Sequence, residues 1–160
     1  IDRGELELHK EEVALRPLLR DIAEKYQLKT AKTIHFDIDC EEGCSVYADA
    51  FCLHEILSNL VDNAVKYSNE EVLIILSGKK TEDGTIVRVH DSGIGIPLSE
   101  QHKIFNKFER VASGSRKTGT SGFGLGLNYV LQVVSAHGGM VKVESMEGSY
   151  SEFTLQFPLR

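Results

Sequence analysis

The pattern of apolar and polar residues predicts three helices. Apolar residues recur at helical spacing over Leu15–Tyr26, with charged residues between them and Pro17 tolerated only in the first turn. The same periodicity continues over Phe51–Lys66. A third helix is expected over Gly126–His137, where a Gly-Gly pair ends it.

Short stretches of alternating apolar and polar residues predict five β-strands. They are Thr33–Asp39, Val72–Ser77, Ile86–Val89, Met140–Glu144 and Phe153–Phe157. Asp83-Gly84 between the second and third stretches predicts a hairpin, and therefore antiparallel pairing. The order of elements predicts an α+β layered sandwich rather than the parallel sheet of a Rossmann domain.

The segment between Pro97 and Phe123 follows neither pattern. It is rich in Ser, Gly, Thr and cationic residues, with one small apolar group at Ile104, Phe105 and Phe108. A stretch of this length without periodicity inside a compact domain is typical of a functional lid or a disordered loop.

The length and composition of the chain exclude some classes of function. The chain has 160 residues, 41% of them hydrophobic, which suits one domain. Its net charge of -6 argues against binding nucleic acid, because phosphate backbones require a broad positive field. No apolar run approaches the roughly 20 residues that span a bilayer, so a soluble cytoplasmic domain is expected. Cys40, Cys44 and Cys52 are expected to be free thiols in a reducing compartment, since no second ligand pair completes a metal site.

Three segments suggest the walls of a binding pocket. On the helix over Phe51–Lys66, the polar residues Asn59, Asn63 and Lys66 lie opposite the apolar face. An amide oxygen suits Mg²⁺ and a lysine suits a phosphate, although a solvated polar face remains the simpler interpretation of this helix alone.

The second wall is a carboxylate that follows a strand. Asp91 precedes a turn with glycines at Gly93 and Gly95, which let the backbone approach a flat ligand closely. A carboxylate accepts hydrogen bonds without donating any, so Asp91 would select adenine over guanine. Asp-Ser-Gly is also an ordinary turn sequence.

The third wall is a glycine-rich run, Gly119–Leu127, that opens a helix. Free N–H groups at a helix start form an anion site, which fits a triphosphate. The spacing matches neither a dinucleotide-binding fingerprint nor a P-loop.

Together these motifs resemble the catalytic domain of sensor histidine kinases. Asn59–Tyr67 is similar to the N box, Asp91–Pro97 to the first glycine box, Ile104–Arg110 to the F box and Gly119–Leu127 to the second glycine box, in the family order. Residues 1–8 resemble the junction that leaves the upstream dimerisation helices, which makes residues 9–160 the ATP-binding domain, with a lid over about 98–123.

The resemblance implies the Bergerat (GHKL) fold, a two-layer α/β sandwich with a mixed, largely antiparallel sheet and a mobile ATP lid. It also implies a cofactor, Mg²⁺-ATP, and a reaction in which the γ-phosphoryl group passes to a histidine on the dimerisation domain. A response regulator receiver domain would be a further partner. The resemblance leaves open whether the parent protein is dimeric and attached to the inner membrane.

Residue roles carry over position by position. Asn63 becomes the Mg²⁺ ligand, and Asn59, Lys66 and Arg110 become the catalytic contacts to phosphate or metal. Asp91 becomes the adenine selector. The other expected nucleotide contacts are Tyr67, Gly93, Gly95, Ile96, Phe108, Gly122, Phe123, Gly124, Leu125, Gly126 and Leu127.

The phosphoryl acceptor is missing from the sequence. His54-Glu55-Ile56 begins like an H box, but the residues that should follow are absent, so the acceptor is expected upstream. Other members of the fold remain alternatives: a serine kinase of the anti-sigma-factor type, an ATPase of the chaperone, topoisomerase or mismatch-repair type, or a degenerate binding module. Asn59 stands where such ATPases carry an acidic residue, which disfavours hydrolysis, and intact Asn63 and Asp91 disfavour a degenerate module.

Overall fold

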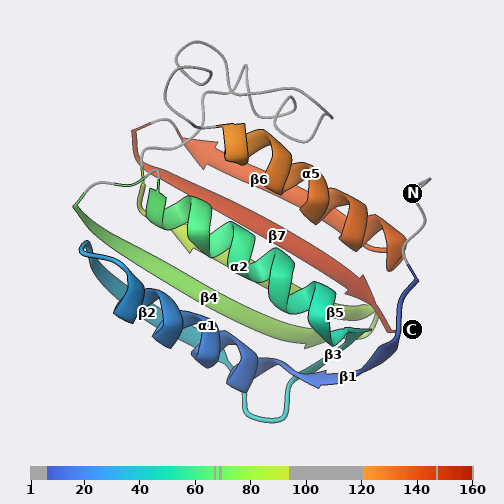
Figure 1. Cartoon of the computed structure of the whole chain (residues 1–160). Helices are drawn as coiled ribbons and strands as arrows, with labels where there is room; N and C mark the ends of the chain where they lie inside the picture. Colours follow the sequence, from blue (N-terminus) through green and yellow to red (C-terminus); the bar gives the residue numbers. More distant parts are fainter. Residues whose placement is uncertain (1–6, 67, 69, 94–120, 147, 160) are drawn as a thin grey trace.

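The computed structural model describes residues 7–66, 68, 70–93, 121–146 and 148–159, which form a two-layer α/β sandwich (Figure 1). One layer is a 5-stranded sheet in the order β2-β4-β5-β7-β6. Its strands are β2 (Thr33–Cys40), β4 (Glu71–Thr81), β5 (Gly84–Asp91), β6 (Met140–Met146) and β7 (Tyr150–Pro158). Only β2 and β4 pair in parallel, and the other pairs in this sheet are antiparallel. The predicted fold class is confirmed.

The helices of the described residues cover one face of this sheet (Figure 1). They are α1 (Leu15–Lys29), α2 (Ala50–Lys66) and α5 (Ser121–Ala136). Pro17 lies in the first turn of α1, as predicted, where its missing N–H is not needed. The apolar face predicted for α2 is buried throughout, with Leu53, Leu57, Leu60, Val61 and Ala64 at most 5% exposed.

The predicted start of the last helix is wrong. Helix α5 begins at Ser121 rather than Gly126, so the end of the predicted lid, 98–123, belongs to the helix. Each glycine costs about 1 kcal/mol relative to alanine inside a helix, and the glycine run therefore argued for a later start. Tertiary packing outweighs that propensity, because Leu127 and Val130 on the same helix are completely buried.

A small second sheet escaped the prediction of five strands. Strand β1 (Lys10–Ala14) pairs antiparallel with β3 (Ser45–Asp49) in a 2-stranded sheet. The sequence of β1, KEEVA, has too few apolar residues to show a two-residue period. Strand β1 forms because it pairs with β3, which lies about 30 residues later in the chain. Among the described residues, the first element therefore begins at Lys10.

The predicted hairpin joins β4 to β5. Thr81 pairs with Gly84 across the turn, and Gly84 has φ of +153°. A Cβ atom at Gly84 would lie 1.8 Å from the carbonyl oxygen of Phe157 on the neighbouring strand β7. Close packing of β5 on β7 thus requires glycine here.

Two further properties bear on the sequence predictions. The three cysteines are free, with Cys40 and Cys44 buried and Cys52 half-buried. In the described part of the chain, none of the helices combines the length and the apolar character needed to cross a membrane.

Candidate functional site

The polar face of α2 is less exposed than a solvated helix face would be. Asn63 is only 8% exposed, Asn59 is half-buried, and only Lys66 projects into solvent. Burying an amide side chain costs free energy unless it finds a partner. The burial of Asn63 therefore does not fit the simpler interpretation of a fully solvated polar face.

Lys66 lies at the end of this face and is held loosely. Its ammonium Nζ lies 3.1 Å from Oδ2 of Asp62, one turn earlier on α2, and the Lys66 side chain is 58% exposed. An exposed ion pair of this kind contributes only about 0 to 1 kcal/mol. A more highly charged anion, such as a phosphate, can therefore recruit the Lys66 ammonium at little cost.

Asp91 is a buried carboxylate at the end of β5. The residue is 6% exposed and lies in the interior of the sheet, paired with Ile74 of β4 and Ser151 of β7. Burial raises the pKa of Asp91 from 3.8 to about 6, although a backbone hydrogen bond from Gly93 and the nearby His90 act in the opposite direction. With a pKa of about 6, most of the Asp91 carboxyl groups are ionised at neutral pH and act only as hydrogen-bond acceptors.

The turn after Asp91 is tied to the neighbouring strand. The N–H of Ser92 donates to the carbonyl oxygen of Leu73 at 3.0 Å, and the N–H of Leu73 donates to Oγ of Ser92, also at 3.0 Å. Gly93, the first expected pocket glycine, is buried. These bonds fix the backbone where the chain leaves the sheet beside Asp91.

Ser151 is a buried polar residue that lies beside Asp91 in the sheet. It belongs to β7 and is 7% exposed. Directly opposed residues of an antiparallel pair project from the same face, so Ser151 and Asp91 share a face of the sheet. The Ser151 Oγ lies 3.1 Å from Oγ of Ser145. Strand register, which a single sequence does not show, makes Ser151 a neighbour of Asp91.

The end of α2 and the end of β5 lie at the same end of the molecule. Helix α2 ends at Lys66, shortly before β4 begins at Glu71. Asp91 pairs with Ile74, also near the beginning of β4. The first two predicted walls are therefore brought together.

The N-terminus of α5 reaches this end as well. Helix α5 leads into β6, whose first residue, Met140, pairs with Gln156 near the far end of β7. Asp91, by contrast, pairs with Ser151 at the near end of β7. Helix α5 therefore runs toward the far end of β7, and it begins at the end of the sheet where β5 ends (Figure 1).

The glycine run supplies the first turn of α5. Ser121, Gly122, Phe123 and Gly124 are its first residues, and the first N–H groups of a helix have no partner within the helix. Together with the helix dipole they attract an anion. Gly126, Leu125 and the buried Leu127 follow within the helix, so the predicted third wall is a helix start rather than a loop.

Contacts between α2 and α5 hold the two helical walls at a fixed distance. The hydroxyl of Tyr129 on α5 donates to Oε1 of Glu55 on α2 at 2.8 Å. At the other end, Nε2 of His137 accepts the N–H of Asp49, which directly precedes α2, at 3.0 Å. These contacts were not predictable from sequence patterns, because each joins residues that lie far apart in the chain.

Several expected site residues lie outside the described residues. They are Tyr67, Gly95, Ile96, Phe108 and Arg110, together with the F box and most of the predicted lid. Their assignment rests on the sequence alone.

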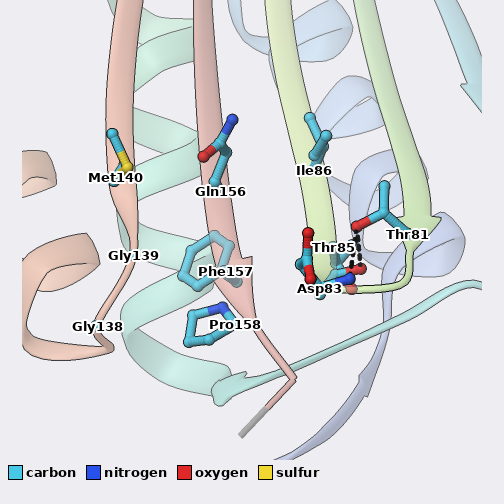
Figure 2. A pocket seen from close by; sticks show the side chains of 11 residues that line it. Thr81, Asp83, Thr85, Ile86, Gly138, Gly139, Met140, Gln156, Phe157 and Pro158 are labelled. Carbon is cyan, nitrogen blue, oxygen red and sulfur yellow. Dashed lines mark hydrogen bonds between the residues drawn. The ribbon is translucent and has the colours of Figure 1, made fainter.

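A cavity of about 250 Å³ lies elsewhere in the molecule. Figure 2 shows it beside the β4–β5 turn, lined in part by Thr81, Phe157 and Pro158. Strand β5 begins at this turn and ends at Asp91, so the cavity and the three walls occupy opposite ends of the sheet. None of the predicted site residues lines it.

Comparison with known proteins places the chain in one family. The family described as "Histidine kinase-, DNA gyrase B-, and HSP90-like ATPase" matches residues 48–160. The circadian input-output histidine kinase CikA of Synechococcus elongatus is 33% identical over 99% of the chain, which spans 22% of that relative. The adaptive-response sensory kinase SasA of Crocosphaera subtropica is 35% identical over 98% of the chain, which spans 41% of it. The chain thus corresponds to less than half of either protein.

Solved structures show the same fold. Full-length ShkA in complex with AMPPNP superposes with a TM-score of 0.80 at 30% identity, covering 96% of the chain and 32% of that protein. A nucleotide-free catalytic domain of the histidine kinase ThkA gives a TM-score of 0.80 at 27% identity, covering 95% of the chain and 97% of that domain. The chain therefore belongs to the family of histidine kinase-, DNA gyrase B- and HSP90-like ATPases and has the sequence and fold of a histidine kinase catalytic domain.

Proposed function

We propose that this domain binds Mg²⁺-ATP between α2, Asp91 and the start of α5, and donates the γ-phosphoryl group to a histidine on an upstream dimerisation domain. The observation that carries the proposal is the meeting of three different chemistries at one end of the sheet: a buried carboxylate, a buried amide and a helix N-terminus. They complement the base, the metal and the phosphates, respectively.

Asp91 is the group that recognises the base. Its carboxylate accepts hydrogen bonds only, so it accepts from the exocyclic amine of adenine and repels the carbonyl oxygen that guanine carries there. Because Asp91 is 6% exposed, water does not compete well for it, which sharpens the preference for adenine.

Asn63 suits a Mg²⁺ ion that arrives with the nucleotide. A single neutral amide oxygen on a helix cannot hold the ion alone, but Mg²⁺ typically takes few protein ligands and completes its shell with phosphate oxygens and water. The burial of Asn63 at 8% exposure fits a ligand that faces a bound group rather than solvent. When bound, Mg²⁺ would offset negative charge on the phosphates.

The protein's own charges orient the triphosphate. The free N–H groups at the start of α5 face the phosphates from one side, and the exposed ammonium of Lys66 reaches them from α2 after it leaves Asp62. Asn59, one turn before Asn63, and Arg110 are proposed to add contacts to phosphate or metal. These groups position and stabilise charge, which is most of what catalysis of phosphoryl transfer requires.

The acceptor histidine is proposed to lie on a separate segment. His137 is unsuited to the role, because it is 3% exposed and both ring nitrogens are engaged, Nδ1 with the Val133 carbonyl at 2.7 Å and Nε2 with the Asp49 N–H at 3.0 Å. His35 and His90 each pair with a glutamate. Residues 1–8 are proposed as the tail of the dimerisation helices, and a response regulator receiver domain as the later recipient, all in the cytoplasm.

Phosphoryl transfer in trans tests the proposal. The domain is incubated with Mg²⁺ and γ-labelled ATP, with and without a dimerisation domain that carries an H-box histidine. We expect acid-labile label on the dimerisation domain only, and none when Asn63→Ala replaces the wild type. Label on the ATP-binding domain alone would contradict the proposed acceptor, and equal release of inorganic phosphate without any acceptor would favour the ATPase alternative.

A further inference from the structure

The end of α2 is held by a lysine that belongs to none of the sequence boxes. Lys32 lies in the turn between α1 and β2 and is half-buried. Its ammonium Nζ lies 2.5 Å from the carbonyl oxygen of Val65, 3.0 Å from that of Ser68 and 3.5 Å from that of Lys66. The three N–H donors of the ammonium thus face two carbonyl oxygens in the last turn of α2 and a third just beyond it.

The C-terminal end of α2 is electrostatically favourable for the Lys32 ammonium. The last carbonyl groups of a helix lack partners within it, and the helix dipole makes that end negative. The Oγ of Ser68 adds a second donor to the Val65 carbonyl at 2.9 Å. Lys32 therefore fixes both the last turn of α2 and the direction in which the backbone leaves it.

We propose that Lys32 is a positioning residue for the nucleotide site, through the backbone of Lys66. The inference rests on the proposed function of that site. Lys66 is the last residue of α2, and its side chain is exposed and, among the described residues, pairs with Asp62. The reach of the Lys66 side chain toward the phosphates depends on the backbone of the final turn, whose carbonyl oxygens Lys32 contacts.

Lys29 is a nearby lysine that serves as a control, because its ammonium contacts an aromatic ring instead of the end of α2. It lies at the end of α1, three positions before Lys32, and is exposed. Its ammonium lies over the ring of Tyr26, 5.3 Å from the centroid. A change at Lys29 removes the same charge from the same region of the surface and leaves the carbonyl clamp intact, so Lys29→Met is a matched control.

The test compares two ligands on purified variants, at a temperature well below unfolding. Mg²⁺-ATP reports on the phosphate contacts together with the rest of the site, and adenosine, which has no phosphate, reports on the contacts to the base and the ribose. For Lys32→Met we expect affinity for Mg²⁺-ATP to fall about tenfold, equivalent to about 1.4 kcal/mol, and affinity for adenosine to stay within about twofold.

The controls separate positioning from general stability. Lys32→Arg keeps the charge and the N–H donors and is expected to restore most of the affinity for Mg²⁺-ATP, while Lys29→Met is expected to bind both ligands as the wild type does. If Lys32→Met does not fold, as judged by circular dichroism, Lys32→Gln takes its place with the same expectations.

Two results would overturn the inference. Unchanged affinity of the Lys32 variant for Mg²⁺-ATP would show that the clamp does not position Lys66. An equal loss for ATP and adenosine would show a general loosening of the site instead. Failure of the wild type to bind Mg²⁺-ATP would be a different outcome, since it would remove the proposed function itself.

Discussion

Replacing Asp91 by asparagine is expected to stabilise the domain at neutral pH while it weakens recognition of adenine. The reason is the burial of the carboxylate, which raises its pKa from 3.8 to about 6. Each unit of pKa corresponds to about 1.36 kcal/mol, so keeping Asp91 ionised in the folded domain costs about 3 kcal/mol. Asparagine retains an oxygen that accepts the Gly93 N–H but buries an amide N–H₂, so we expect a net gain of about 1 to 3 kcal/mol in the free energy of unfolding.

The sign of the pH dependence follows from the same pKa. The folded wild type binds a proton at Asp91 below about pH 6, whereas the unfolded chain binds it only below 3.8. The stabilisation from this proton is complete below the unfolded pKa and is lost as the pH rises through the folded pKa. The advantage of Asp91→Asn should therefore be small near pH 4 and grow up to about pH 6 to 7.

Urea unfolding of both proteins across this pH range measures the effect. Asp83→Asn is the control, because Asp83 is exposed in the β4–β5 turn and the same chemical change there should alter stability by less than about 0.5 kcal/mol. A stability difference between Asp91→Asn and wild type that stays constant with pH, or a wild type that is the more stable at neutral pH, would refute the reasoning. Loss of the charged hydrogen bond should also weaken ATP binding by about 1.5 to 3 kcal/mol.

Two more substitutions test how the site is supported. Asp49→Ala should lower the free energy of unfolding by about 1 to 2 kcal/mol, because the Asp49 carboxylate accepts the N–H of Cys52 and that of His9, both at 2.9 Å. The hydrogen bond from the His9 N–H holds the pKa of Asp49 below its usual value. The stabilisation by the Asp49 carboxylate should therefore disappear as the pH falls through that lowered pKa. An equal effect of Asp49→Ala in urea unfolding at neutral and strongly acid pH would contradict this reasoning. Gly84→Ala should lower the free energy of unfolding by more than about 2 kcal/mol in the same assay, since the added Cβ would overlap the backbone of β7. Gly148 has φ of +82° and open space around it, so Gly148→Ala should lower it by only about 1 kcal/mol. Similar losses for both variants would rule out the steric explanation.

The sequence predicted most where structure is local. The apolar period of α2 and the alternation in β4 and β5 mark those elements directly, because each side chain packs according to its own position. The order of the three walls along the chain likewise predicts a nucleotide site.

What the sequence did not show depends on distant partners. Strand β1 exists because it pairs with β3, and α5 continues through its glycines because of packing farther along the helix. Lys32 resembles any surface lysine until the end of α2 is placed beside it. These features arise from long-range contacts, which local propensity does not encode.

Base selectivity tests the central claim most directly, because it depends on the buried Asp91 at the meeting point of the three walls. Calorimetric titration of the wild-type domain with ATP and with GTP, each in the presence of Mg²⁺, is the measurement. The account predicts that ATP binds and that GTP binds at least about tenfold more weakly, as expected for one lost charged hydrogen bond. Absence of ATP binding, or equal affinity for the two nucleotides, would contradict it.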